Sequence, residues 1–286
     1  MKINKKGLEE SEFLKGLDTI ALKPKMLYCW GELPTERPKC VAIVGARKHT
    51  KYGEEVAYRA AFELAQAGIW VISGLALGID SIAHRGALAA EGKTVAVLGT
   101  AIERISPRRH VGLAKEIVEK GGAILSEYAE SDKFFPANFL YRNRLISGLA
   151  DAVLIVEAGE RSGTLNTAAH ALEQGRDLWV VPGDINRPNS VGCNRLILQG
   201  AMPYTSAKDI LAVLMPRQKQ RQKSLDLSAC NEAEKKILTA IFQGLRDGAE
   251  IIKVLKMSAS EFNCNITLLE VKGRVRSLGA NQWTLA

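Results

Sequence analysis

The sequence predicts an α/β fold with a doubly wound, mostly parallel sheet covered by helices on both faces. Between residues 40 and 215, short β-branched runs alternate with longer runs rich in alanine, leucine and glutamate, which is the pattern of parallel strands joined by helices. Glycine, serine and threonine recur where these strands end. With 286 residues, 47% of them hydrophobic, the chain can bury a sizeable core. We therefore expect a Rossmann-like layout.

The expected elements follow in order along the chain. The strands are CVAIVG (40–45), IWVISG (69–74), TVAVLG (94–99), AILSE (123–127), AVLIVEA (152–158), LWVVPG (178–183) and AMPYT (201–205). The longest helical stretches run from Lys51 to Ala67, Gly78 to Ala90, Leu113 to Lys120, Leu140 to Leu149 and Thr164 to Gln174.

Changes in composition divide the chain into four parts. We expect an N-terminal extension at 1–39, the Rossmann-like domain at 40–215 and a basic linker at 216–224, where PRQKQRQK carries four cations and no acid. Three short helical patterns and a β-hairpin then predict a winged-helix module at 225–286. Its candidate recognition helix, Ala259 to Lys272, has one cation, which favours protein docking at least as much as duplex reading.

The composition narrows the location and the chemistry. No apolar run approaches the ~20 residues of a membrane span, and the N-terminus lacks the apolar core of a signal peptide, so we expect a cytoplasmic protein without membrane contact. The cysteines are scattered, with no CxxC pair and no histidine at zinc spacing. We therefore expect reduced thiols, no metal and no cofactor. The cysteines are Cys29, Cys40, Cys193, Cys230 and Cys264.

The common nucleotide-enzyme motifs are missing. The loop after the first strand is GARK instead of G-x-G-x-x-G, no acid follows the second strand, and the sequence has no GxxxxGK[ST]. The segment GERSGTLNT resembles the phosphate cradle of nucleotide N-glycosidic hydrolases, but Thr167 stands where their glutamate would be. Asp80 and His84 have acid/base spacing, although a helix cap and a structural histidine explain them better. We expect no enzyme.

Cations at the strand ends favour a chain of phosphates as the ligand. Arg47 and Lys48 follow the first strand, Arg161 follows the fifth, and Arg142, Asn143 and Arg144 lie beside several aromatic residues. Arginine forks and flat rings together suit single-stranded nucleic acid. The alternative is that Arg142 and Arg144 form ion pairs with Glu127 or Glu157 while the aromatic rings pack under the sheet.

Seven ordered segments resemble the DNA-processing protein A family, also called DprA or Smf. They include AIVGARKHTKYG, VISGLALGIDSIAHRGAL, RNRLISGLADAVLIVEA, SGTLNTAAHALEQGR and VPGDINRPNSVGCNRLILQGA. The resemblance implies a non-catalytic homodimer that binds single-stranded DNA and helps load the RecA recombinase in natural transformation. It also implies a DNA pocket lined by Arg47, Lys48, Ser73, Gly74, Phe139, Arg142, Asn143, Arg144, Arg161, Ser162, Gly163 and Thr164.

The chain departs from the family pattern at three points. About 39 residues precede the first strand, too few for the usual N-terminal helical domain. Ser106-Pro107 stands where the family has Tyr-Pro, and Phe139-Leu140-Tyr141 replaces the usual F-P-x before Arg142. A nucleotide-binding protein or nucleotide N-glycosidic hydrolase stays the alternative function.

Overall fold

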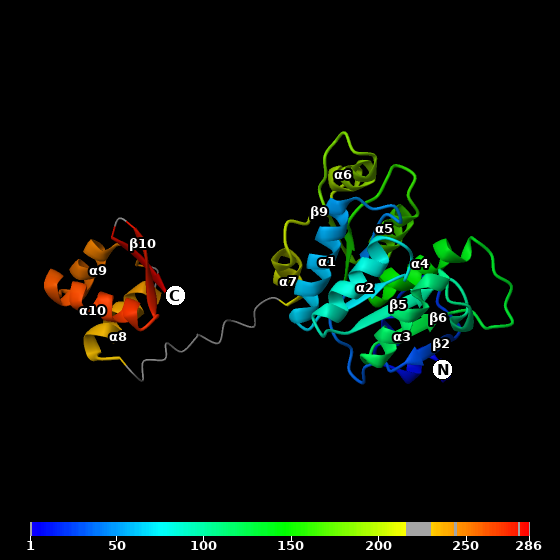
Figure 1. The fold of residues 1–286 in the computed structure, drawn as a ribbon, viewed down its shortest axis with the longest axis horizontal. Coiled ribbons are helices and arrows are strands. Elements are labelled where there is room, and N and C mark those ends of the chain that lie inside the picture. Colours follow the sequence, from blue (N-terminus) through cyan, green and yellow to red (C-terminus); the bar gives the residue numbers. More distant parts are fainter. Residues whose placement is uncertain (1, 216–229, 243–244, 280, 286) are drawn as a thin grey trace. The chain divides into compact units, whose positions relative to one another are not determined.

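The structure is a computed structural model that describes residues 2–215, 230–242, 245–279 and 281–285. The chain forms two compact units, Met1–Pro216 and Arg217–Ala286, and Figure 1 shows the elements of each. The basic linker expected at 216–224 lies outside the described residues.

The first unit contains a nine-stranded sheet in the order β1-β2-β6-β5-β4-β3-β7-β8-β9. The seven strands from β6 to β9 in this order are parallel, whereas β1 and β2 pair antiparallel at one edge. The predicted α/β class and all seven predicted strands are confirmed. The strands are β1 (Ile3–Lys6), β2 (Leu27–Gly31), β3 (Cys40–Val44), β4 (Trp70–Ser73), β5 (Thr94–Leu98), β6 (Ala123–Ser126), β7 (Ala152–Ile155), β8 (Asp177–Val180) and β9 (Met202–Pro203).

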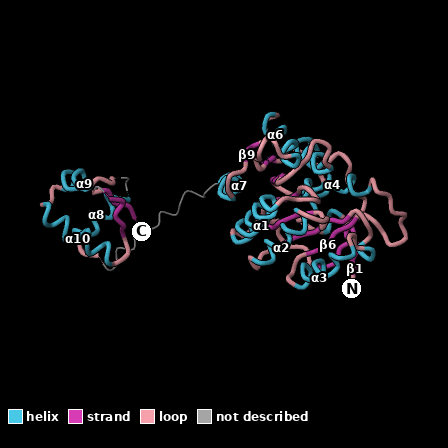
Figure 2. Tube along the Cα trace, turned by 45° about the horizontal axis from the view of Figure 1, so that its top comes forward, coloured by secondary structure: helices cyan, strands magenta, loops and turns pink. Residues whose placement is uncertain are grey.

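Helices cover both faces of this sheet, as Figure 2 shows. Alternate residues of β3 point to opposite sides: Val41 and Ile43 pack in one buried cluster, Ala42 and Val44 in another, as the two-residue period of a strand requires. α1, α2, α3 and α7 pack on the first side, and α4, α5 and α6 on the second. The helices are α1 (Lys51–Gln66), α2 (Ile79–Ala89), α3 (Val111–Glu119), α4 (Asn138–Leu149), α5 (Gly163–Glu173), α6 (Val191–Leu198) and α7 (Ala207–Leu214).

The strand order changes direction between β3 and β7. β4, β5 and β6 extend to one side of β3, while β7, β8 and β9 extend to the other. In open parallel sheets, the loops after the two strands at such a point diverge and leave a crevice at their carboxyl ends. The loops after Val44 and Ile155 therefore define the first place to look for a ligand site.

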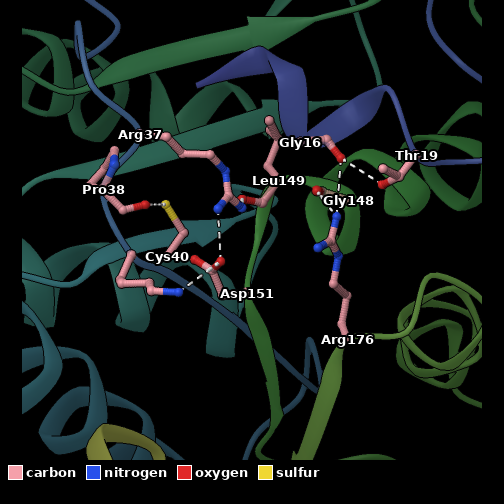
Figure 3. Close-up of polar contacts among 10 residues, drawn as sticks. Gly16, Thr19, Arg37, Pro38, Cys40, Gly148, Leu149, Asp151 and Arg176 are labelled. Carbon is pink, nitrogen blue, oxygen red and sulfur yellow. Dashed lines mark hydrogen bonds and ion pairs between the residues drawn. The ribbon is translucent and has the colours of Figure 1, made fainter. Parts of the chain in front are cut away.

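Residues 1–39, which we expected as an extension, supply β1 and β2 to the sheet and pack Phe13, Leu14 and Leu17 into its core. Polar contacts hold this segment at the end of the sheet where β3 and β7 begin. Figure 3 shows the Asp151 carboxylate facing the Arg37 guanidinium at 2.8 Å, and the same carboxylate accepts the Cys40 backbone N–H at 2.8 Å.

Arg176 makes a second polar connection between the N-terminal segment and the sheet domain. Its guanidinium donates to the carbonyls of Gly16 at 3.1 Å and Gly148 at 2.9 Å (Figure 3). It thereby joins the N-terminal segment to the end of α4.

Burial raises the pKa of the Cys40 thiol, whose backbone N–H bonds Asp151, to about 12, so this cysteine is a packing residue, as predicted.

The second unit has three helices followed by a hairpin, the order expected of a winged-helix module. Ile251, Phe262, Ile266 and Leu269 form its core. α10 contains no lysine or arginine, and the Lys272 amine after it binds the buried Glu234 carboxylate at 2.7 Å. The elements are α8 (Glu232–Phe242), α9 (Gly248–Leu255), α10 (Ala259–Val271), β10 (Val275–Gly279) and β11 (Gln282–Leu285). None of the described helices in either unit is long and apolar enough to cross a membrane.

We predict that Asp151→Asn lowers the free energy of unfolding by about 2 kcal/mol, because it leaves the Arg37 guanidinium without its carboxylate and weakens the bond to the Cys40 amide. Chemical denaturation measures the change. Asp18→Asn is the matched control, since Asp18 pairs with Lys23 only at the surface, at 3.7 Å, and should change stability by less than about 0.5 kcal/mol. Equal effects of the two substitutions would contradict the role given to Asp151.

Candidate functional site

A cleft of about 420 Å³ lies at the carboxyl ends of β3 and β7, where the strand order reverses. The loops after β3 and β7 and the first turns of α4 and α5 form its walls. Among the predicted site residues, eight line it: Arg47, Lys48, Phe139, Arg142, Asn143, Ser162, Gly163 and Thr164.

Two glycines set the path of the loop that carries Arg47. A Cβ on Gly45 would lie 2.7 Å from Ile79, and one on Gly78 would lie 2.3 Å from the Ala46 carbonyl oxygen. Gly78 also has φ +81°, which side chains strongly disfavour. The start of α2 therefore packs directly against this loop, and the Ile79 N–H donates to Ala46 at 3.2 Å.

Glu157 positions the other end of the same loop. Its carboxylate is buried and accepts hydrogen bonds from the Thr50 backbone N–H at 3.0 Å, the Thr50 hydroxyl and the Asn189 amide at 3.3 Å. Asn189 also donates to the Lys48 carbonyl at 2.8 Å. These bonds fix the turn between Arg47 and the start of α1.

The wall of the cleft contains a buried pair of opposite charges, Arg142 and Asp80. Arg142 is 4% exposed and donates to the Gly74 carbonyl at 2.8 Å and to the Val97 carbonyl. Asp80 accepts the N–H of Gly74 at 3.2 Å. Burial lowers the pKa of Arg142 to about 10, so it stays charged at neutral pH, and burial raises the pKa of Asp80 while Arg142 opposes this shift.

The exposed cations are Arg47 and Lys48. Within the described residues neither forms an ion pair with a carboxylate. The Arg47 guanidinium carbon lies 5.5 Å from the centre of the Phe139 ring, a cation–π distance, and Phe134 meets that ring edge-on at 5.5 Å. Gly99 allows this position, since a Cβ there would lie 2.8 Å from Phe139.

The start of α5 supplies small polar groups. The Ser162 hydroxyl caps the helix by accepting the Thr164 N–H at 3.2 Å, and Asn143 steadies the turn by donating to the Gly163 carbonyl at 3.4 Å and to Asn166. A helix N-terminus favours anions because its first amides and its dipole present positive charge. The cleft thus combines exposed cations, hydroxyls and an aromatic ring.

Four predicted site residues do not line the cleft. Ser73 is buried and donates to the Ile43 carbonyl at 2.7 Å, and a Cβ on Gly74 would meet both Arg142 and Asp80, so these two shape the support below the cleft. Arg161 is exposed beside the start of α5. The structure corrects the prediction that Arg144 lines the cleft. Its side chain is 3% exposed, its guanidinium donates to both Glu127 carboxylate oxygens at 2.8 Å, and its guanidinium carbon lies 3.8 Å from the centre of the Tyr141 ring. Its charge is therefore already neutralised, as the ion-pair alternative had it.

Asp80 and His84 do not form an acid/base pair. Asp80 accepts backbone N–H groups, whereas the His84 Nδ1 lies 2.7 Å from the Thr94 hydroxyl oxygen. Thr167, which stands where the N-glycosidic hydrolases have their glutamate, lines the cleft and is buried. In the part of the chain that the structure describes, no group of three or more His, Cys, Asp or Glu residues is placed to hold a metal.

A larger cavity of about 1140 Å³ was missed by sequence reasoning. It lies between α3, the end of β2, and the loops after β5 and β6. Its lining comes from separate segments with no shared motif. Phe134 lines this cavity and also packs on Phe139 of the cleft.

The comparisons with known proteins agree on one family. The family model of DNA recombination-mediator protein A matches residues 6–215. The Smf protein of Escherichia coli is 45% identical over 188 residues, which are 66% of this chain and 50% of that protein. The DNA processing protein DprA of Bacillus subtilis is 36% identical over 219 residues, or 76% and 73% of the two chains. The chain spans about half the length of the E. coli relative.

Two solved structures of DNA processing protein A share the fold. The Streptococcus pneumoniae protein aligns with a TM-score of 0.69 and 35% identity, covering 75% of each chain. The Helicobacter pylori protein, whose structure is described for its single-stranded DNA binding mode, aligns with a TM-score of 0.65 and 33% identity. That alignment covers 71% of this chain and 92% of the other.

His84 gives a pH prediction. The Thr94 hydroxyl donates to the Val71 carbonyl at 2.7 Å and so accepts from His84 Nδ1–H, while the buried Nε2 has no partner among the described residues. Burial lowers the pKa of His84 to about 3 from 6.5. Protonation then occurs only in the unfolded chain, so stability is present above pH 6.5 and is lost as the pH falls.

We expect His84 to contribute a loss of about 1.4 kcal/mol in the free energy of unfolding per pH unit as the pH falls from 6 to about 5. Urea denaturation of the wild type and of His84→Gln at both pH values measures it. The variant should lose this part of the slope. An identical slope in both proteins would contradict the buried, neutral state of His84.

Proposed function

We propose, because this chain belongs to the DNA recombination-mediator protein A family, that it binds single-stranded DNA in the cleft between β3 and β7. The H. pylori relative has a described binding mode for single-stranded DNA. The site residues of the proposal are those that line the cleft: Arg47, Lys48, Phe139, Arg142, Asn143, Ser162, Gly163 and Thr164. Arg161 lies just outside this set and can meet a phosphate that leaves the cleft.

The observation that carries the proposal is the exposed Arg47 guanidinium beside the Phe139 ring. A structural arginine at this position would have a carboxylate partner, as Arg144 has in Glu127. Arg47 has no such partner among the described residues, although nearby His49 and Lys51 both lie close to Glu54. Its charge is therefore available to a phosphate, and Phe139 offers a ring next to it.

The mixture of groups favours an unpaired strand over a duplex. Phosphates carry the charge that Arg47, Lys48 and the α5 N-terminus attract. The Phe139 ring can contribute about 1 to 3 kcal/mol by stacking on a base, which requires that the base be unstacked from its neighbours. In a duplex the bases are paired and stacked inside the helix, so the ring would have no such partner.

The proposal includes no catalytic turnover. The Glu157 carboxylate, just after strand β7, already accepts hydrogen bonds from Thr50 and Asn189. Asp80 is bound to backbone N–H groups beside Arg142. Further parts of the proposal follow from the family resemblance: transfer of the bound strand to the RecA recombinase during natural transformation, a homodimer, and a cytoplasmic location.

The first test compares Arg47→Ala, Phe139→Leu and the control Arg85→Ala, which removes an exposed cation of α2 that lines neither pocket. We expect Arg47→Ala to weaken binding to an oligothymidylate and to reduce the slope of log affinity against log salt by about 0.7 per lost phosphate contact. Phe139→Leu should cost about 1 to 3 kcal/mol with the slope unchanged, because stacking releases no counterions.

Fluorescence anisotropy at several salt concentrations supplies both quantities. A duplex competitor of equal length should displace the labelled oligomer poorly. If Arg47→Ala behaves like Arg85→Ala, or if the duplex competes as well as the single strand, the cleft is not the binding site for an unpaired strand.

The second test addresses the hydrolase alternative. The full chain is incubated with the four ribonucleoside and four deoxyribonucleoside monophosphates, and free base is measured by chromatography. We expect no base release above that of a buffer control, because the two buried carboxylates beside the cleft, Glu157 and Asp80, are both engaged by hydrogen bonds. Release that disappears in the Glu157→Gln variant would support the hydrolase and contradict the proposal.

A further inference from the structure

We infer that the 1140 Å³ cavity beside the cleft binds bases of the same unpaired strand, an inference that rests on the proposed function. The cavity is larger than the usual range of about 300 to 1,000 Å³ for ligand pockets. Much of its wall is apolar or aromatic, as a base requires. These side chains are Trp30, Ile102, Ile105, Val111, Val118 and Phe134.

An aromatic pair connects the cavity to the cleft. Phe134 lines the cavity, Phe139 lines the cleft, and their rings meet at 5.5 Å with an angle of 69° between their planes. Phe134 lies in the loop before α4 and is 48% exposed, whereas Phe139 lies in the first turn of α4. A strand that places one base near Phe139 therefore passes over Phe134 when its next bases enter the cavity.

The charge around the cavity suits phosphates. Four exposed cations line it, Arg104, Arg108, Lys115 and Lys133, and within the described residues none forms an ion pair. Of the three acids in the lining, Asp132 is held by the Ala129 N–H at 2.8 Å. The other two, Glu103 and Glu119, are exposed.

One buried polar atom lines the cavity without a partner. Thr100 is 8% exposed, and no group among the described residues bonds its hydroxyl oxygen. A buried hydroxyl without a hydrogen bond is costly. The polar edge of a nucleobase offers both donors and acceptors, which a purely apolar ligand lacks.

The test follows binding against oligomer length. Oligothymidylates of increasing length are titrated into the full chain, with anisotropy reporting affinity and tryptophan fluorescence reporting cavity occupancy. The Trp30→Phe variant assigns the signal from the cavity wall. We expect short oligomers to bind without quenching Trp30, and longer oligomers to quench it and to bind roughly tenfold tighter, as stacking of one further base would give.

Two changes should remove this gain. Val118→Phe fills the cavity from α3, and the double variant Arg108→Ala/Lys115→Ala removes exposed cations without touching the core. Both should leave the affinity for short oligomers unchanged and lower that for long oligomers about tenfold, whereas Arg85→Ala should change neither.

The outcomes separate the two ideas. This inference would be overturned if both cavity variants bound long oligomers with wild-type affinity and with wild-type quenching of Trp30. In that case, a loss of short-oligomer binding in Arg47→Ala would still support the cleft as a binding site for single-stranded DNA. Failure of the wild type to bind oligomers of any length would overturn the proposed function and this inference together.

Discussion

The cleft depends on the buried guanidinium of Arg142. By donating to the carbonyls of Gly74 and Val97, it ties together the loop after β4 and the end of β5. Removing a charged group from water costs several kcal/mol unless it is compensated by opposite charge and hydrogen bonds. Asp80 supplies the opposite charge and the two carbonyls supply the hydrogen bonds. Both side chains lie beside Gly74, where a Cβ would collide with them. Gly74, the first glycine of the SGLALGID segment, is thus required by this packing and not by a phosphate.

This neutral pair determines which charges remain for a ligand. The charges of Arg142 and Asp80 offset each other below the surface, and those of Arg144, two residues further along α4, and Glu127 do the same. The positive charge at the cleft therefore comes from Arg47 and Lys48, on a loop fixed at one end by Gly78 and at the other by Glu157. Such a loop holds its cations in place before a ligand arrives, so little conformational entropy is lost on binding.

Sequence patterns predicted the sheet well because its central strands are short, β-branched and buried on both faces, which leaves few other interpretations. β1 and β2 were missed. β1 contains two lysines at the edge of the sheet, and the pairing of β1 with β2 and of β2 with β6 is not visible in the sequence. For the site, position along the chain was a sound guide, since residues after strand ends meet at one rim. Position along the chain could not tell apart the roles of Arg142, Arg144 and Arg47. Burial decides the role of Arg142, and Glu127, 17 residues away in sequence, decides that of Arg144.

The lining of the larger cavity could not be predicted from the sequence either. Trp30, Val118 and Phe134 come from strand β2, helix α3 and a loop, and nothing in their spacing along the chain brings them together. What joins them to the cleft is the contact of Phe134 with Phe139, which makes one aromatic wall between a cationic site and an apolar one. A free nucleotide would use one side of this wall, and a duplex would have no exposed base for either. An unpaired strand has phosphates and bases in repeated succession, and it is the ligand whose chemistry matches both sides at once.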